Sequence, residues 1–315
     1  MTKYANLLSQ MSDKLFLTDG GLETTLVFHD GMDLPCFAAF DLLKDSAGTI
    51  RLRDYYQQYI DIALEHGLGF VLESVTWRAS SDWGKELGYS EDTLSQANIR
   101  SIELLQQLRE QNQTDKSPMI ISGNLGPRGD GYAADWLMSP DETAEYHSPQ
   151  IRSLVEAGVD QIAAFTLPTT DEAIGIVQAA QNTGIPPVIS FTVETDGRLP
   201  DGQSLHSAIE AVDAATNQGP AYYMINCAHP SHFDSVLAGD KPWLKRIRGL
   251  RANASCKSHA ELDESLTLDD GNPQELATQY KKILNLLPNI NVLGGCCGTD
   301  HRHVAAIAQA CTVSV

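Results

Sequence analysis

Residues 161–193 read QIAAFTLPTTDEAIGIVQAAQNTGIPPVISFTV, and this stretch predicts one complete strand–helix–strand unit. Residues 161–167 and 188–193 are short, nearly continuous apolar runs, as expected for parallel strands that are covered on both faces. Residues 171–182 between them have helical periodicity, and Gly184 follows where a helix C-cap belongs. Parallel strands joined through a helix are the repeating unit of α/β folds.

The same alternation of apolar run and amphipathic stretch occurs eight times along the chain. The other strands are predicted at 15–18, 70–73, 119–122, 222–226, 249–252 and 291–293, and the other helices at 52–66, 95–111, 141–157, 204–217 and 273–287. Ser139, Pro140 and Glu142 have the pattern of an N-cap, an N1 proline and a capping-box acid. Gly158 and Gly219 are predicted C-cap positions.

Eight such units without a compositional break favour an α/β fold of the (β/α)8 TIM-barrel type, with residues 1–315 as a single domain. The alternative is an open, doubly wound sheet with an additional lobe. The first apolar run is followed by Thr18-Asp19-Gly20-Gly21 and not by a GxGxxG motif, which disfavours a dinucleotide-binding sheet.

The charge balance excludes several classes of partner. The 315 residues include 22 Lys+Arg and 41 Asp+Glu, for a net charge of -19. Such an excess of acid repels phosphate backbones and anionic lipid, so we expect no nucleic-acid or membrane partner, and small-molecule ligands that are neutral or cationic. The N-terminus lacks a basic segment followed by an apolar one, and no apolar run approaches about 18 residues, which predicts a cytoplasmic protein. The sequence does not indicate an oligomeric state.

Three of the six cysteines stand at predicted strand ends. Cys296 and Cys297 lie in VLGGCCGT at 292–299, and Cys227 directly follows the strand at 222–226. In a barrel both strand ends open on one face, so the three thiols can converge. Three thiolates suit Zn²⁺, and a site with three protein ligands leaves a fourth position for water or substrate. The alternative is a set of buried, inert thiols.

The remaining candidate ligands are less suitable. His229, His301 and His303 are close enough in sequence to supply a fourth ligand, but we expect them at the surface or behind the ligands. The other cysteines, Cys36, Cys256 and Cys311, have no comparable setting.

Asp19-Gly20-Gly21, Asn226-Cys227 and the GGCCGT motif at 294–299 together make the whole chain resemble the homocysteine S-methyltransferase family. Residues 126–130 and 76–80 are also similar to segments of that family. Members are zinc enzymes with a (β/α)8 barrel that move a methyl group onto a thiol. The resemblance implies that Cys227, Cys296 and Cys297 hold zinc. It also implies that Asp19 contacts the amino-acid part of the acceptor and that the backbone N–H groups of Gly20 and Gly21 receive its carboxylate.

One position departs from the family pattern. Members that use homocysteine usually carry a glutamate after the fourth strand that binds the substrate ammonium, and this chain has Phe165 there. Glu194 and Asp196, just after the fifth strand, are candidate replacements; the alternative is that both are solvated loop charges.

The expected activity is therefore transfer of a methyl group from a cationic donor to homocysteine, giving methionine. S-methylmethionine, betaine and S-adenosylmethionine are the donors considered, and the aromatic residues Trp77, Trp83, Tyr132 and Trp136 are candidates to hold such a cation. One alternative is a methyltransferase for another thiol or selenol, with Phe165 shaping the pocket. The others are a zinc-binding barrel without catalysis and a barrel regulated by a disulfide that includes Cys227.

Overall fold

The computed structural model describes residues 14–263, 265 and 267–312 of the chain, and eight parallel strands in these residues form a closed barrel. Each strand pairs with the next, and β1 also pairs with β8 through Phe16 and Val292, so the open-sheet alternative is excluded. The strands are β1 (Phe16–Leu17), β2 (Gly69–Glu73), β3 (Met119–Leu125), β4 (Gln161–Leu167), β5 (Pro187–Phe191), β6 (Tyr222–Asn226), β7 (Ile247–Ala252) and β8 (Val292–Gly295).

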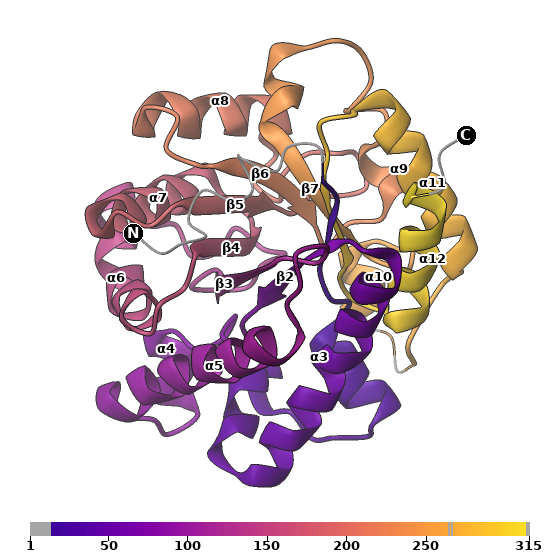
Figure 1. The fold of residues 1–315 in the computed structure, drawn as a ribbon. Coiled ribbons are helices and arrows are strands. Elements are labelled where there is room, and N and C mark those ends of the chain that lie inside the picture. Colours follow the sequence, from indigo (N-terminus) through magenta and orange to yellow (C-terminus); the bar gives the residue numbers. More distant parts are fainter. Residues whose placement is uncertain (1–13, 264, 266, 313–315) are drawn as a thin grey trace.

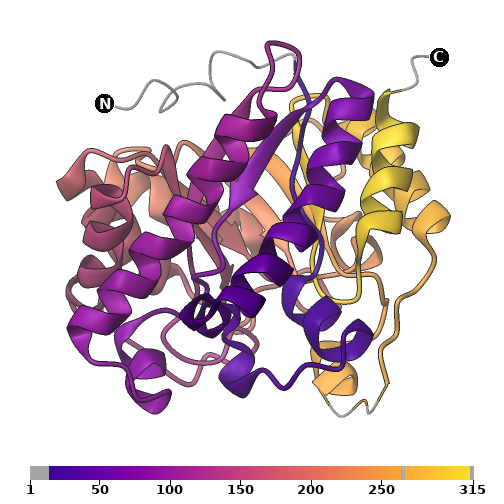
Figure 2. The same cartoon turned by 60° about the horizontal axis from the view of Figure 1, so that its bottom comes forward.

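Helices surround the barrel on its outside (Figure 1). The longer ones are α3 (Ser46–His66), α5 (Glu91–Asn112), α6 (Pro140–Glu156), α7 (Thr170–Thr183), α8 (Leu205–Thr216), α11 (Pro273–Leu286) and α12 (His301–Thr312). The short α2 (Leu22–Thr24), α4 (Ser81–Glu86), α9 (Pro230–Phe233) and α10 (His259–Asp263) lie in segments that follow strands. Short 3-10 or π-helical segments at Thr25–His29, Pro35–Phe37, Ala39–Lys44 and Pro242–Arg246 complete the elements of the described residues. In Figure 2 the long helices run alongside the barrel, and the purple strand arrow points toward the end where loops gather.

Two apolar layers explain why the predicted runs form strands. One cluster fills the barrel interior and includes Phe16, Val71, Phe165 and Tyr222. A larger cluster lies between the strands and the outer helices. Because a central strand contributes side chains to both layers, nearly all strand residues are buried, and the sequence shows continuous apolar runs instead of alternation.

The eight predicted strands are confirmed, and 161–167 and 222–226 match their observed bounds. The capping box at Ser139 and Glu142 is present at the start of α6. The C-cap prediction at Gly219 is wrong, because α8 ends two residues earlier with Asn217 in the left-handed conformation, at φ 54°. Asparagine adopts this conformation more readily than other residues with a side chain, apart from aspartate, so no glycine is required. No helix in the described ranges has the combination of length and apolar character that a membrane span requires.

Candidate functional site

A cavity of about 540 Å³ opens at the carboxyl ends of the strands. Its lining comes from the ends of β1–β4 and β6–β8, and it includes all three cysteines singled out by the sequence. This is the face on which TIM barrels carry their active sites. The loop after β7 adds Leu262 and Leu268 to the wall, and the loop after β3 adds Asp130 and Tyr132.

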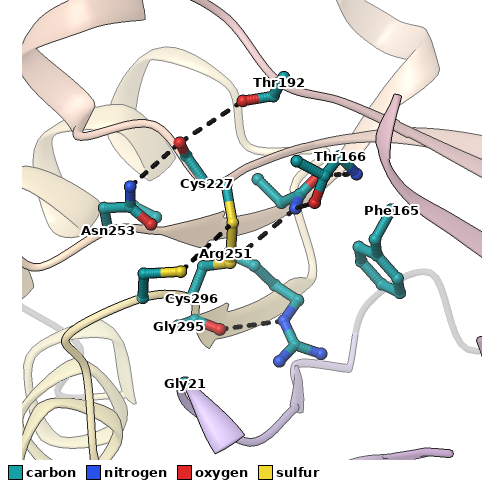
Figure 3. The surroundings of a disulfide bond; sticks show 12 residues. Gly21, Phe165, Thr166, Thr192, Cys227, Arg251, Asn253, Gly295 and Cys296 are labelled. Carbon is teal, nitrogen blue, oxygen red and sulfur yellow. Dashed lines mark hydrogen bonds between the residues drawn. A yellow bond between two sulfur atoms is a disulfide. The ribbon is translucent and has the colours of Figure 1, made fainter. Parts of the chain in front are cut away.

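The sulfur atoms of Cys227, Cys296 and Cys297 all lie within 4.8 Å of one another, and no histidine joins this group in the described chain. Cys227 and Cys296 form a disulfide, and Cys297 Sγ is 3.9 Å from Cys227 Sγ (Figure 3). Tetrahedral zinc with Zn–S bonds of about 2.3 Å requires sulfurs about 3.8 Å apart. The Cys227–Cys297 spacing therefore fits two ligands of one ion, and reduction of the disulfide would free the third sulfur.

The backbone holds Cys227 in a conformation that residues with side chains rarely adopt, with φ 53°. Its carbonyl oxygen accepts hydrogen bonds from Asn253 Nδ2 at 3.1 Å, Thr192 Oγ1 at 3.4 Å and His259 Nε2 at 2.5 Å. Three donors on one carbonyl fix the turn after β6, and a strained φ of this kind persists only where surrounding contacts impose it. The result is a sulfur directed at the loop after β8.

Close packing explains the two glycines before the cysteine pair. A Cβ atom on Gly294 would lie 1.9 Å from Thr18 Oγ1, and one on Gly295 would lie 2.0 Å from Thr299 Oγ1. The loop is also hydrogen-bonded to both neighbouring strands, through Gly295 N to Asp19 O at 2.9 Å and Cys296 N to Ala252 O at 2.9 Å. Glycine is required because the loop passes directly against these groups.

Cys297 is the free thiol of the group. Its Sγ lies 3.8 Å from the hydroxyl of Tyr132, and burial raises its pKa above the ordinary value. A thiol in this environment stays neutral unless a cation compensates its charge.

Arg251 is a major component of the site that the sequence analysis did not single out. Its Nη2 lies 2.8 Å from Asp19 Oδ1 and donates to Gly20 O at 3.1 Å, and its Nε donates to Gly295 O at 3.0 Å. The guanidinium carbon is 5.2 Å from the centre of the Phe165 ring (Figure 3). Arg251 therefore links the DGG loop to the cysteine loop. The only sequence signal was an arginine within the predicted strand at 249–252, whose other residues are apolar.

The predicted acceptor-binding residues after β1 line the cavity, but several of their groups already have partners. Asp19 is 4% exposed, and its Oδ2 accepts from Tyr55 Oη at 3.0 Å. The backbone N–H of Gly21 donates to Thr299 O at 3.0 Å. Any ligand contact to Asp19 would be made in addition to the pairs with Arg251 and Tyr55.

Two of the other carboxyl groups that line the cavity have strongly raised pKa values, and neither was predicted. Burial raises the pKa of Glu73 to about 8, against the lowering effect of Arg251. Burial likewise raises the pKa of Glu23 to about 7. Strongly shifted carboxyl groups inside a cleft are typical of functional sites.

The candidate replacements for the missing glutamate lie elsewhere. Glu194 does not line the cavity; its Oε1 is 3.2 Å from His259 Nδ1, and its side chain is 36% exposed. Asp196 is exposed and accepts from the backbone N–H of Arg198. Of the three histidines, His301 is exposed, His303 pairs with Asp300 at 3.1 Å, and His229 caps α9.

The rim aromatics already contact cationic side chains of the protein. The guanidinium carbon of Arg78 lies 4.1 Å from the centre of the Trp77 ring and 3.9 Å from that of Trp83. Arg128 lies 5.1 Å from the centre of the Trp136 ring. Each of these three indoles therefore has at most one face left for a donor cation.

Comparison with known proteins agrees with this arrangement. The model of the family described as homocysteine S-methyltransferase matches residues 16–311. "Homocysteine S-methyltransferase 1" of Brassica oleracea var. italica is 23% identical over 335 residues, covering 98% of each chain. The oxidised form of the homocysteine methyltransferase MmuM from Escherichia coli superposes with a TM-score of 0.76 at 19% identity, covering 98% of this chain and 99% of that one. The metallated form of the same protein gives a TM-score of 0.73, also at 19% identity, covering 96% and 98%.

The family model spans nearly all of the described residues, and the solved structures share the barrel. The DGG, NC and GGCC segments lie together around one cavity. The chain is an enzyme that belongs to the homocysteine S-methyltransferase family.

Proposed function

We propose that this enzyme moves a methyl group from a cationic donor to the sulfur of homocysteine, with a zinc ion held by Cys227, Cys296 and Cys297. The observation that carries this proposal is the group of three sulfurs within 4.8 Å inside the barrel mouth. We infer further that residues 1–315 form one domain. Because zinc binding requires all three thiols in the reduced state, we place the enzyme in a reducing compartment such as the cytoplasm.

The chemistry of the donor set supports zinc. When bound, zinc lowers the pKa of a coordinated thiol, so the acceptor sulfur would be presented as a thiolate. A free thiol has a pKa near 8.5, which leaves only a few per cent as the nucleophile at neutral pH. Three thiolate ligands keep the bound sulfur electron-rich, and we expect a shell of oxygen or imidazole ligands to do so less well.

The remaining residues of the site orient and enclose the reactants. The Asp19, Gly20 and Gly21 segment borders the cavity beside the cysteine loop, which suits contact with the amino-acid part of the acceptor. Tyr132 packs against His259, with ring centres 4.1 Å apart, and closes the wall on the side of Cys297. Because the rim is rigid, it can hold donor and acceptor in line, which raises their effective concentration.

The donor is proposed as a sulfonium or quaternary ammonium cation, namely S-methylmethionine, betaine or S-adenosylmethionine. Attack on such a methyl group removes the positive charge of the donor. An acidic mouth therefore binds the donor more strongly than its demethylated product. Asp130 and Glu23, which both line the cavity, are candidates to attract the donor cation.

Metal analysis and methyl transfer test the proposal together. We expect about one zinc per chain in protein purified with reductant, and loss of both zinc and activity in Cys227→Ser and Cys296→Ser. Cys256→Ser is the matched control, because Cys256 is an exposed free thiol, and this variant should keep both. Reduced parent protein that contains no zinc would contradict the proposal. A panel of thiols with each of the three donors then identifies the substrate pair.

A further inference from the structure

The cavity contains a second set of groups that the zinc proposal does not use. The position of the usual ammonium-binding glutamate is taken by Phe165, which is 5% exposed and faces Arg251. Glu194 lies outside the cavity and pairs with His259. If the acceptor carries an amino group, another carboxylate must balance its charge.

Unpartnered polar atoms show where that carboxylate is. Among the described residues that line the cavity, four with side chains more than nine-tenths buried have an acceptor oxygen without a hydrogen-bond donor. Asp19 Oδ1 has the ion pair with Arg251 instead, at 2.8 Å, and the other three atoms are Glu73 Oε2, Asn124 Oδ1 and Asn253 Oδ1. Buried acceptors are almost always paired, so a cluster of unpaired ones facing one cavity indicates a ligand that brings donors.

Glu73 is also the carboxylate that lacks a full counter-charge. Arg251 is the one guanidinium close to both Asp19 and Glu73, and it lies 2.8 Å from Asp19 Oδ1 but 4.0 Å from Glu73 Oε1. The other hydrogen bonds of Arg251 go to backbone carbonyls. Burial accordingly raises the pKa of Glu73 to about 8, and a cation bound beside it would favour the ionised form.

The strand register brings Glu73 and Asn124 to the same part of the cavity. Glu73 of β2 pairs with Ser122 of β3, and Asn124 is two residues further along β3. Because side chains alternate along a strand, Ser122 and Asn124 point to the same face. A carboxylate and an amide oxygen therefore stand together at the ends of neighbouring strands.

The chemical complement of these atoms is a primary ammonium group, which carries one positive charge and three donors. We propose that Glu73, assisted by Asn124, binds the ammonium group of the acceptor thiol in place of the glutamate that Phe165 replaces. This inference rests on the proposed function. It restricts the substrate class to thiols that carry a primary amine, which excludes a less polar acceptor.

The test compares two acceptors that differ only in the amino group, homocysteine and 4-mercaptobutanoate, in the zinc-loaded enzyme. In Glu73→Gln we expect kcat/KM for homocysteine to fall by about 100-fold, mainly through KM, because a buried charge pair is lost. The value for 4-mercaptobutanoate should stay within about twofold, since no partner for an amine is involved. Asn124→Leu should shift the same ratio in the same direction by a smaller factor.

The matched control is Glu172→Gln. Glu172 is also buried, at 4% exposure, but it pairs with His147 and does not line the cavity, so the ratio of the two kcat/KM values should not change. Equal losses for both acceptors in Glu73→Gln would assign Glu73 a structural role and overturn the inference. A selective loss for homocysteine in Glu194→Gln, with none in Glu73→Gln, would move the ammonium site to Glu194 and also overturn it.

Calorimetric binding separates this inference from the proposed function. L-methionine carries the same ammonium group without a free thiol, and 4-(methylthio)butanoate lacks that group. Selective loss of L-methionine binding in Glu73→Gln would support the ammonium site even if no thiol were methylated, in which case only the proposed function fails. Unchanged L-methionine binding in Glu73→Gln would overturn the ammonium site whatever the activity.

Discussion

Asp19 and Arg251 form a buried ion pair, with Oδ1 and Nη2 2.8 Å apart, that joins the ends of β1 and β7 in the wall of the cavity. The side chains are 5% and 9% exposed, so solvent screens the pair little. Arg251 also donates to the carbonyl oxygens of Gly20 and Gly295, which makes it a brace between the predicted acceptor loop and the cysteine loop.

Removing Arg251 should be strongly destabilising. Arg251→Met leaves Asp19 buried without its cation, and breaking such a pair costs about 3–5 kcal/mol in the free energy of unfolding. Urea unfolding of the reduced protein measures this change. The double variant Asp19→Asn/Arg251→Met should recover part of the loss, because no charge then remains unpaired. A double variant less stable than the single would show that the brace to the carbonyls, and not the charge pair, dominates.

The role of Arg251 illustrates what the sequence could and could not show. The barrel was predictable because each central strand is buried on both faces, so its apolar run is continuous and identifiable without tertiary information. Cys227, Cys296 and Cys297 could be grouped because strand ends of a barrel share one face. Which polar side chain inside a strand points into the barrel depends on register, and that is a property of the closed sheet.

Glu73 shows the same limit. It was included in the predicted strand at 70–73, but a glutamate at a strand end has the same sequence pattern whether it faces solvent or the cavity. Glu194 was chosen because its loop follows a strand, and the structure turns it toward His259 at the rim. The difference arises from loop geometry after β5, which composition and periodicity do not encode.

The cysteine pairing predicts a change in accessible thiols on reduction. The described structure has a disulfide between Cys227 and Cys296 and free thiols at Cys36, Cys256, Cys297 and Cys311. Alkylation of the denatured, unreduced protein followed by mass spectrometry should label these four cysteines only. After reduction all six should react, and zinc uptake should begin only then. Zinc binding at full stoichiometry without reductant would contradict the shared use of these sulfurs.

The glycines before Cys296 should be intolerant of even a methyl group. A Cβ on Gly294 would lie 1.9 Å from Thr18 Oγ1 and 2.9 Å from Asp19 O, so Gly294→Ala must displace the cysteine loop. We expect loss of zinc and a lower Tm, measured by metal analysis and thermal unfolding. Gly202→Ala is the control: at φ 84° it adds backbone strain of about 1 kcal/mol, but no atom lies within 4 Å of its Cβ. Equal zinc content in the two variants would show that the cysteine loop can accommodate the added methyl group and still bind zinc.

The buried carboxyl groups predict a stability that falls as pH rises. The pKa of Glu73 is raised from 4.5 to about 8 and that of Glu23 from 4.5 to about 7, both chiefly by burial. The folded protein therefore binds protons that the unfolded chain releases above about pH 4.5, so these groups stabilise fully below that pH and lose their contribution toward pH 8. Two charged groups face Glu73. Arg251 lowers the pKa of Glu73 and so reduces the pH dependence of stability, whereas Asp19 raises that pKa and increases it.

Urea unfolding across this pH range measures the contribution of Glu73. Glu73→Gln carries no titrating proton, so its free energy of unfolding should decline less steeply between pH 5 and pH 8 than that of the parent. Glu172→Gln, which alters a buried glutamate outside the cavity, controls for the loss of a buried carboxyl group as such. Parallel curves for the parent and Glu73→Gln would contradict the raised pKa.

Restoring the usual family residue at position 165 should not restore the usual mode of binding. A glutamate there would enter beside Arg251, whose guanidinium carbon lies 5.2 Å from the present ring centre and already serves Asp19 at 2.8 Å. The new carboxylate would pair with Arg251 and weaken the brace to the DGG loop. We therefore expect Phe165→Glu to raise KM for homocysteine and to lower Tm, because the apolar interior also loses an aromatic ring. Phe165→Leu, which loses packing without adding charge, should lower Tm but leave the preference for homocysteine over 4-mercaptobutanoate unchanged. A fall in KM for homocysteine in Phe165→Glu would instead show that the ammonium group lies against β4, and Arg251 would then not capture the added charge.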